Sequence, residues 1–214
     1  MTGFPWKGVA WDIDGTLIDS EPLHHQALIA ACRVSGLDIT HLDDRVFAGL
    51  QTRDVWCRLR KDWLSLPACA PFCRWINRYY VAGAVGLHPM PGAVSTIRAL
   101  AAQGVVQVCA SNSDRVVVDA NLRQLAVGGA ICASVAGDEV RAGKPDPAIY
   151  RRAADLAGLA PHDMLAVEDS LTGLQAARAA GMMVVLCGPD APHPAADYHI
   201  EALSELPDLR RTCR

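Results

Sequence analysis

Asp12 and Asp14 stand two residues apart, directly after the short apolar run GVAW, in the stretch WDIDGTLIDS at residues 11–20. A buried carboxylate can serve as a nucleophile, as a general acid or base, or as a ligand of a hard cation. Other side chains with such chemistry also follow apolar runs or precede a helix: Ser111, Asn112, Lys144, Glu168 and Asp169. Their joint chemistry depends on whether the fold brings them together.

The elements that must position these residues are visible after residue 90. Four runs, at residues 105–110, 130–137, 163–169 and 182–187, are apolar throughout, which is typical of strands buried on both faces. Alanine-rich stretches with helical spacing alternate with them, at residues 92–104, 113–127, 146–159 and 170–181. The alternation predicts an α/β fold with a Rossmann-like parallel sheet and helices on both faces.

An insertion separates the first strand from the rest of the sheet. Residues 7–12 resemble the later strands in composition, yet the next such run begins only at residue 105. Between them, residues 20–88 have helical spacing of apolar side chains, and HPMPG at residues 88–92 marks the return to the sheet. We therefore predict an α/β core of residues 1–19 and 89–214 and an inserted helical cap domain of residues 20–88, hereafter the cap segment.

Ligands bind at the carboxyl ends of the strands in open parallel sheets, so the polar residues there should converge. Asp12, Asp14 and Asp169 would repel one another without a cation, which predicts a hard divalent ion, most naturally Mg²⁺. A phosphate is then the natural substrate group, with the Ser111 hydroxyl and Lys144 as its partners. Asp12 is the candidate nucleophile of an aspartyl-phosphate, and Asp14 can protonate the leaving oxygen and later activate water.

The stretches WDIDGTLIDS, CASNSD, AGKPDPAIY and AVEDSLTGLQAARAAGM resemble the four ordered motifs of the haloacid dehalogenase-like hydrolase superfamily, and the cap segment resembles its small helical cap. The resemblance covers nearly the whole chain. It is greatest to the group of phosphoglycolate phosphatases, sugar-phosphate phosphatases and β-phosphoglucomutases. The DxDGT form differs from that of the superfamily's true dehalogenases, which lack the second Asp and need no metal.

The resemblance implies a role for each matching residue. Asp12 would be nucleophile and metal ligand, and Asp14 would be general acid and base with its backbone carbonyl on the metal. Thr16 would support the loop. The remaining roles are phosphoryl binding by Ser111, with Asn112 beside it, stabilisation of the nucleophile and phosphoryl group by Lys144, and Mg²⁺ binding by Asp169 and Glu168.

Two cap residues are weaker candidates for substrate contacts. By resemblance, His24 lies at a hinge position that can reach the site, and Arg53 lies where a cap side chain contacts the distal part of a sugar phosphate. Each has an alternative, since His24 can be a packed side chain and Arg53 a solvated charge.

These residues predict a Mg²⁺-dependent phosphatase that acts on a small phosphorylated metabolite, such as a sugar phosphate or phosphoglycolate. A β-phosphoglucomutase-like phosphosugar mutase shares all the core residues and remains an alternative. A non-catalytic binding relative is a third possibility, which the intact acidic residues and Lys144 disfavour.

Composition excludes other classes of function. The 214 residues are 51% apolar, the net charge is −3, and no long basic run is present, so neither nucleic acid nor a membrane surface is an expected partner. The N-terminal residues lack the layout of a secretory signal, and no apolar stretch is long enough to span a bilayer.

The eight cysteines form no metal-binding pattern, which favours reduced packing residues. A cytoplasmic monomer is expected.

Overall fold

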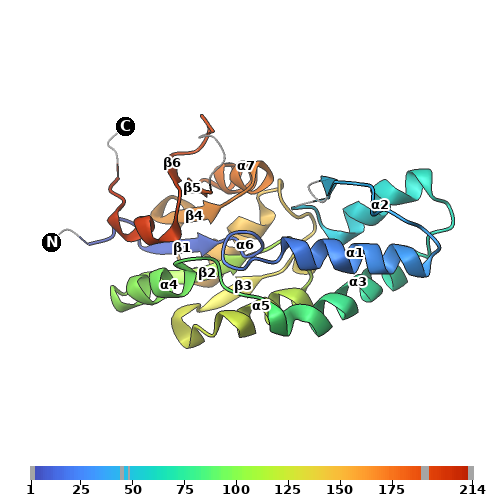
Figure 1. Ribbon diagram of the computed structural model, residues 1–214. Coiled ribbons are helices and arrows are strands. Elements are labelled where there is room, and N and C mark those ends of the chain that lie inside the picture. Colours follow the sequence, from blue (N-terminus) through green and yellow to red (C-terminus); the bar gives the residue numbers. More distant parts are fainter. Residues whose placement is uncertain (1–2, 44–45, 48, 189–192, 212–214) are drawn as a thin grey trace.

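The computed structural model describes residues 3–43, 46–47, 49–188 and 193–211. Its sheet has six parallel strands in the order β3-β2-β1-β4-β5-β6 (Figure 1). The strands are β1 (Gly8–Trp11), β2 (Val106–Ala110), β3 (Ala133–Val135), β4 (Met164–Glu168), β5 (Met183–Cys187) and β6 (Tyr198–Ile200). The predicted Rossmann-like parallel sheet is confirmed.

Helices follow the strands as the alternating pattern predicted. Those of the sheet domain are α4 (Ala93–Ala102), α5 (Arg115–Leu125), α6 (Ala148–Ala157) and α7 (Leu171–Ala180). Short 3₁₀ segments occur between them, of which the longest is η6 (Leu203–Asp208) near the C-terminus. Each expected strand and helix after residue 90 is present within a few residues of its predicted bounds.

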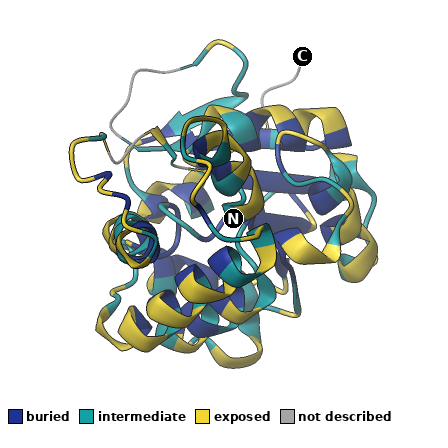
Figure 2. Cartoon of the chain, turned by 90° about the vertical axis from the view of Figure 1, so that its right-hand side faces the viewer, coloured by how far each residue is buried: buried dark blue, intermediate teal, exposed yellow. Residues whose placement is uncertain are grey.

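The strands are apolar throughout because both faces of the sheet are covered. In β1, Val9 and Trp11 pack toward α4, α5 and η6, whereas Ala10 packs toward α6 and α7. Figure 2 shows the buried residues concentrated on the strands and the inner helix faces, with exposed residues on the outside. Neither face of the sheet is left for a ligand, so the chemistry must lie at the strand ends.

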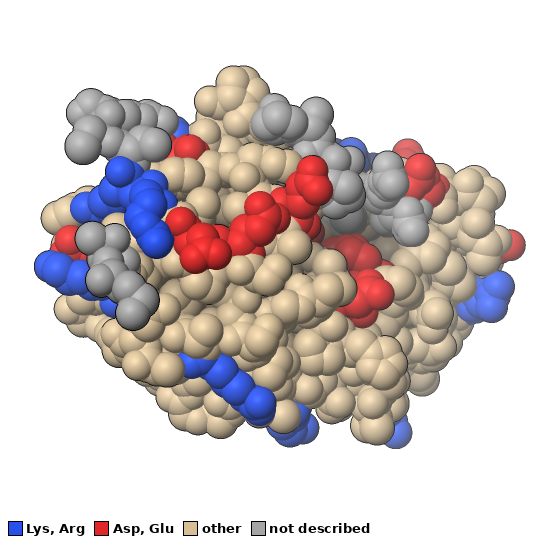
Figure 3. Space-filling view, turned by 60° about the vertical axis from the view of Figure 1, so that its left-hand side comes forward, with Lys and Arg blue, Asp and Glu red and all other residues tan. Residues whose placement is uncertain are grey.

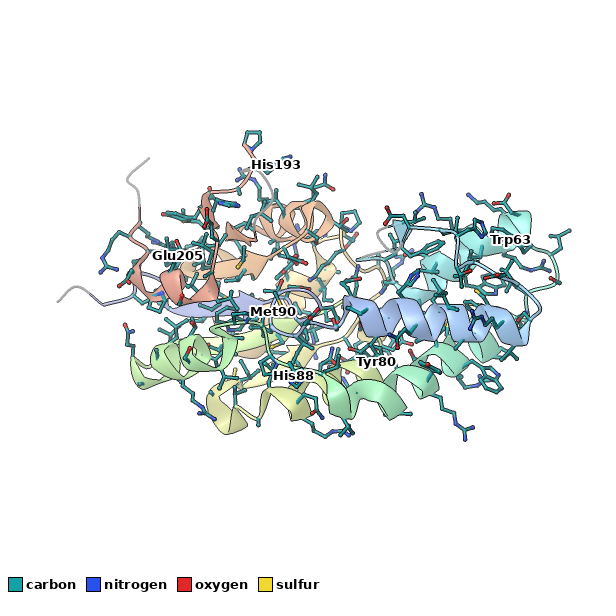
Figure 4. The ribbon with its side chains drawn as sticks, viewed as in Figure 1. Trp63, Tyr80, His88, Met90, His193 and Glu205 are labelled. Atoms are coloured by element: carbon teal, nitrogen blue, oxygen red, sulfur yellow. The ribbon has the colours of Figure 1, made fainter. Side chains whose placement is uncertain are left out.

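The cap segment forms a helical layer beyond the carboxyl ends of the strands (Figure 1). It contains α1 (Glu21–Val34), α2 (Thr52–Asp62) and α3 (Cys69–Gly83), which share a hydrophobic cluster of their own. This cluster continues into Val117 and Ala120 of α5. Figure 4 shows Tyr80 of α3 on the side of the segment nearest the sheet and Trp63 at its far end.

Two cysteines of the described part, Cys57 and Cys132, are exposed, so the prediction that the cysteines are packing residues does not hold for these two. The seven cysteines in the described residues are free; Cys213 lies outside them. On the face drawn in Figure 3, Lys and Arg side chains are dispersed, and acidic side chains form a band. None of the helices in the described part of the chain has both the length and the apolar character required to cross a membrane.

Candidate active site

The register of the central strands places the predicted motifs at one edge of the sheet. Trp11 at the end of β1 is paired with Cys109 of β2 and with Val167 of β4. The residues that follow each strand therefore emerge side by side. Asp12 follows β1 directly, and Glu168 ends β4.

A tight turn brings the first motif against the last. Gly15 has a φ of 82°, a left-handed conformation that glycine adopts at little cost. A Cβ atom at this position would lie 2.2 Å from Oδ2 of Asp169. The Gly of DxDGT is therefore required both by its backbone conformation and by the approach of a carboxylate. Thr16, behind it, is buried, and its hydroxyl lacks a hydrogen-bond partner in the described part of the chain.

Lys144 joins the first and last motifs through two ion pairs. Its Nζ lies 2.6 Å from Oδ1 of Asp12 and 2.6 Å from Oε1 of Glu168. All three side chains are buried. Burial alone lowers the pKa of Lys144, but the charges of Asp12 and Glu168 outweigh it and raise the pKa above its ordinary value. Lys144 is therefore a permanent cation at this site.

Glu168 is fixed from several sides. Besides the Lys144 ion pair, it accepts hydrogen bonds from Oη of Tyr150 and, at 3.1 Å, from Oγ of Ser170. Ser170 also caps α7 by accepting a hydrogen bond from the backbone N–H of Gly173. Glu168 is thus held at the start of a helix, where a negative charge is favoured.

Gly173→Ala is expected to disturb this arrangement although it adds only one methyl group. A Cβ atom at Gly173 would lie 1.9 Å from the Glu168 carboxyl carbon, in a fully packed region. We expect a loss of about 1–3 kcal/mol in the free energy of unfolding, as is usual for overpacking, together with reduced activity. Chemical denaturation measures the first quantity. Gly129→Ala is the matched control, because a Cβ atom there meets nothing within 4 Å; an equal effect of both variants would contradict the prediction.

Asp12, Glu168 and Asp169 form a cluster that could bind a divalent cation, since ligand atoms of all three lie within 4.8 Å of one another. Oδ2 of Asp12 is buried and has no hydrogen-bond partner among the described residues. Burial raises the pKa of Asp12; Lys144 opposes this rise, and Glu168 and Asp169 add to it. Burial and the charge of Glu168 raise the pKa of Asp169, which lies at the exposed edge of the cluster, to about 7. The cluster has more negative charge than Lys144 alone can balance.

Asp14 has a different environment, two residues away. Its two carboxylate oxygens accept hydrogen bonds of 2.8–2.9 Å from four side chains: Ser20, Ser111, Ser113 and Asn121. Nε2 of His24 lies 3.0 Å from Oδ1. Burial raises the pKa of Asp14, but the charge of His24 and these hydrogen bonds outweigh it, so that the pKa lies below its usual range. In this arrangement Asp14 is ionised and its side chain is not part of the cation-binding cluster.

Asn112 connects three loops. Its Nδ2 donates to the backbone carbonyls of Gly49, at 2.9 Å, and Lys144, at 3.2 Å, and its Oδ1 accepts from the backbone N–H of Lys144 at 2.8 Å. Gln51 adds another bond between the cap segment and the core, from its Nε2 to the carbonyl of Gly137 at 2.9 Å. The amide of Asn112 therefore positions Lys144 here, and its predicted contact with phosphate stays a prediction.

A cavity of about 420 Å³ lies between the strand ends and the cap segment. Its core side is lined by Asp12, Asp14, Asn112, Ser113, Lys144, Asp169 and Ser170. Ser111 is fully buried and does not line this cavity, whereas Ser113 does. The predicted catalytic side chains thus converge on one cavity, with Ser111 behind its wall.

The two cap candidates are placed differently. His24 lines the cavity, contacts Asp14 and stacks on Tyr80 with ring centroids 4.3 Å apart. Burial lowers the pKa of His24, but the charge of Asp14 outweighs this and raises it. Arg53 is exposed on α2 and is not among the residues that line the cavity. Its predicted contact with substrate stays a prediction, and its neighbour Thr52 occupies the lining position instead.

Sequence reasoning missed several residues that hold the charged groups in place. Ser20 has the N-cap position of α1, but its hydroxyl donates to Asp14 and does not cap the helix. Asn121 is fully buried on α5, and Tyr150 is fully buried on α6. A polar side chain on the apolar face of an amphipathic helix is the signal that could have identified Asn121.

Comparison with known proteins agrees with the fold and with these motifs. The model of the haloacid dehalogenase-like hydrolase family matches residues 6–181. The chain is 33% identical to protein CbbY of Rhodobacter capsulatus, over 92% of this chain and 94% of CbbY. It is 31% identical to a phosphoglycolate phosphatase of Rhodospirillum rubrum, over 84% of this chain and 78% of that enzyme.

A similar fold occurs in the crystal structure of CbbY from Rhodobacter sphaeroides in complex with phosphate. The TM-score is 0.86 at 23% sequence identity, over 95% of this chain and 100% of that chain. The family model covers most of the chain, and the predicted motifs meet at one cavity. This protein belongs to the haloacid dehalogenase-like hydrolase family.

Proposed function

We propose that this protein is a Mg²⁺-dependent phosphatase that hydrolyses a small phosphorylated metabolite through an aspartyl-phosphate intermediate. The observation that carries the proposal is the difference between the contacts of the two Asp12 carboxylate oxygens. Oδ1 is held by Lys144 at 2.6 Å, while Oδ2 is buried beside two further carboxylates and has no hydrogen-bond partner in the described part of the chain. A carboxylate so placed is suited to bind a cation and to attack phosphorus. The phosphatase among its relatives supports the same activity.

Asp12, Glu168 and Asp169 are the side chains that would hold Mg²⁺, with the backbone carbonyl of Asp14 as a further ligand. The fit rests on their oxygen ligands, on their uncompensated negative charge and on the orphaned Oδ2 atom. When bound, Mg²⁺ would neutralise the transferring phosphoryl group. Glu168 is fully buried and already accepts bonds from Lys144, Tyr150 and Ser170, so it would have the smaller share in metal binding.

The residues of the chain divide the reaction into two transfers. In the first, a carboxylate oxygen of Asp12 bonds to phosphorus, the ester P–O bond breaks, and Asp14 gives a proton to the leaving oxygen. In the second, Asp14 takes a proton from water, the water oxygen bonds to phosphorus, and the bond between phosphorus and Asp12 breaks, which releases inorganic phosphate and restores the Asp12 carboxylate. Lys144 stabilises the phosphoryl group in both steps. Ser111 would join it only after its hydroxyl leaves Asp14 and reaches the cavity, and Asn112 holds the backbone of Lys144 in place.

Asp14 must change its surroundings to act as an acid. Five side chains now favour its ionised form, which is the form required of the base in the second step. Transfer of a proton to the leaving oxygen requires a protonated Asp14, and therefore a loss of some of these bonds. Ser20 and His24 belong to the cap segment, so a displacement of this segment would remove two of the five.

Metal affinity is expected to depend on pH because Asp169 has a raised pKa. Its pKa of about 7 in the metal-free protein means that Mg²⁺ must displace a proton below neutral pH. Because the pKa of Asp12, a second ligand, is raised as well, the apparent Kd for Mg²⁺ should rise by at least about tenfold for each pH unit below 7. Mg²⁺-induced shifts of the melting temperature, measured from pH 5.5 to 8.5, test this. Asp169→Asn should weaken Mg²⁺ binding more than Glu168→Gln; the reverse order would mean that Glu168 is the principal ligand.

The proposed activity is tested by measuring inorganic phosphate from hexose 1- and 6-phosphates, 6-phosphogluconate, phosphoglycolate and an aryl phosphate, with Mg²⁺ and with EDTA. We expect release from at least one metabolite in proportion to substrate consumed, and none with EDTA. An isomerised sugar phosphate without release would show the mutase activity instead. Binding without turnover in the presence of Mg²⁺ would show a non-catalytic relative.

A further inference from the structure

The cap side of the cavity is largely apolar. Each of the three cap helices contributes one nearly buried aliphatic side chain, and the loop before α2 contributes two partly buried apolar ones: Leu28 of α1, Val55 of α2, Ile76 of α3, Phe47 and Leu50. The side chains from the helices are 5–6% exposed and belong to the hydrophobic cluster of the cap segment. This surface, hereafter the apolar wall, faces the carboxylates across the cavity.

The polar groups beside the apolar wall are suited to hydroxyls more than to anions. Thr52 and His25 line the cavity on the cap side, and Ser113 lines it on the core side. Glu21 of α1 also lines the cavity, which places a further negative charge in the site. Hydroxyls of a substrate can be accommodated here, but a second negative charge would meet Glu21.

Lys144 and His24, two basic side chains of the cavity, are already engaged with carboxylates. Lys144 is the only Lys or Arg among the described residues that line it, and it pairs with Asp12 and Glu168. His24 pairs with Asp14. Apart from His25, the described lining residues offer no further basic side chain to a phosphate or carboxylate on the far end of a substrate, and such a group would lose its hydration against the apolar wall.

We infer that the substrate is a phosphate monoester of an uncharged alcohol that places an apolar face, such as a deoxygenated carbon, against the apolar wall. The inference rests on the proposed phosphatase activity and specifies its substrate class. It separates this chain from its phosphoglycolate phosphatase relative, whose named substrate has a carboxylate as its second anionic group. Ile76 and Val55 are then residues that determine specificity.

Matched pairs of substrates test the inference. Phosphoglycolate is compared with 2-hydroxyethyl phosphate, ribose 1,5-bisphosphate with ribose 5-phosphate, and ribose 5-phosphate with 2-deoxyribose 5-phosphate. In each of the first two pairs, we expect kcat/KM to be about 100-fold higher for the compound that has no second anionic group, namely 2-hydroxyethyl phosphate and ribose 5-phosphate. The second anionic group of the other compound would lack a compensating partner. In the third pair, the deoxy sugar should be favoured by about tenfold.

Two variants of buried aliphatic residues separate a role in specificity from a role in stability. Ile76→Ala removes part of the apolar wall and should lower kcat/KM for 2-deoxyribose 5-phosphate more than for methyl phosphate, chiefly through KM. Leu59→Ala is the control, because Leu59 is buried in the same hydrophobic cluster but is not among the described residues that line the cavity. It should lower the melting temperature and leave the ratio between substrates unchanged.

The outcomes distinguish this inference from the proposed function. If phosphate is released with Mg²⁺ but the compounds with a second anionic group are preferred, the inference is wrong and the proposed phosphatase activity is retained. Arg45 lies outside the described residues, so bisphosphate turnover that is lost in Arg45→Ala would also overturn the inference. Equal effects of Ile76→Ala on 2-deoxyribose 5-phosphate and methyl phosphate would show that the apolar wall does not determine specificity. Release from no phosphate ester would overturn the proposed function itself.

Discussion

Asp12→Asn is expected to reduce phosphate release by at least about 10⁴-fold, because an amide cannot form the acyl-phosphate bond. The fold should survive, since the Asn Oδ1 can still accept the hydrogen bond from Lys144 and Glu168 remains as the partner of its charge.

In metal-free protein the Asp12→Asn variant should be somewhat more stable than the wild type near neutral pH. A carboxyl group whose pKa is raised on folding disfavours the folded state once it ionises, and the substitution removes that carboxyl group. The measurements are phosphate release and thermal unfolding in EDTA.

Asp19→Asn is the matched control, since Asp19 belongs to the same motif but its side chain is exposed. This variant should keep nearly full activity. A residual activity of Asp12→Asn above about 1% would exclude Asp12 as the nucleophile, because loss of an attacking group leaves only the contribution of binding and electrostatic stabilisation. Labelled phosphate that remains covalently bound after acid quenching in the wild type, and is absent in Asp12→Asn, would identify the intermediate directly.

The fold could be predicted from sequence because its strands are buried on both faces. The apolar runs of β2, β4 and β5 leave no alternative to a covered parallel sheet, and the helices between them carry their own periodicity. β6 was not predicted, since it has three residues, Tyr198–Ile200, at the edge of the sheet and its sequence YHI lacks an apolar run. An edge strand of this length depends on pairing with β5, which no local pattern reveals.

The convergence of the charged residues could also be predicted, but their division into two groups could not. Strand order places Asp12, Lys144 and Glu168 at one edge, and their opposite charges make the ion pairs expected. Asp14, by contrast, turns toward Ser20, His24 and Asn121, which are supplied by the cap segment and by α5. These contacts depend on how the cap segment packs on α5, a tertiary detail that lies beyond motif spacing. Arg53 is exposed for a related reason, because Thr52 and Val55 occupy the face of α2 that lines the cavity.

Lys144→Met is expected to affect stability as strongly as it affects activity. The substitution keeps most of the side-chain volume but leaves the buried Asp12 and Glu168 carboxylates facing each other without their shared cation. Removal of one partner from a buried ion pair commonly costs about 3–5 kcal/mol. We expect a loss of this size in the free energy of unfolding of the metal-free protein near pH 7. Phosphate release should also fall by at least about 10³-fold, because the transferring phosphoryl group loses a fixed positive charge.

The pH dependence of this loss separates an electrostatic cause from a packing defect. In Lys144→Met the carboxyl of Asp12 loses the charge that opposes the rise of its pKa, so folding is favoured at low pH and disfavoured as pH rises. In the wild type Lys144 limits that rise, so the same change of pH affects stability less. The difference in the free energy of unfolding between wild type and variant should therefore become smaller from pH 8 to pH 5 in EDTA. Near pH 7, Mg²⁺ should restore part of the stability that the variant has lost. Lys7→Met is the control, because Lys7 pairs with Asp163 on the surface at 3.0 Å and should change stability little at any pH. A gap for Lys144→Met that stays constant across this range would indicate a packing defect and would contradict the role of Lys144 as the counter-charge of Asp12 and Glu168.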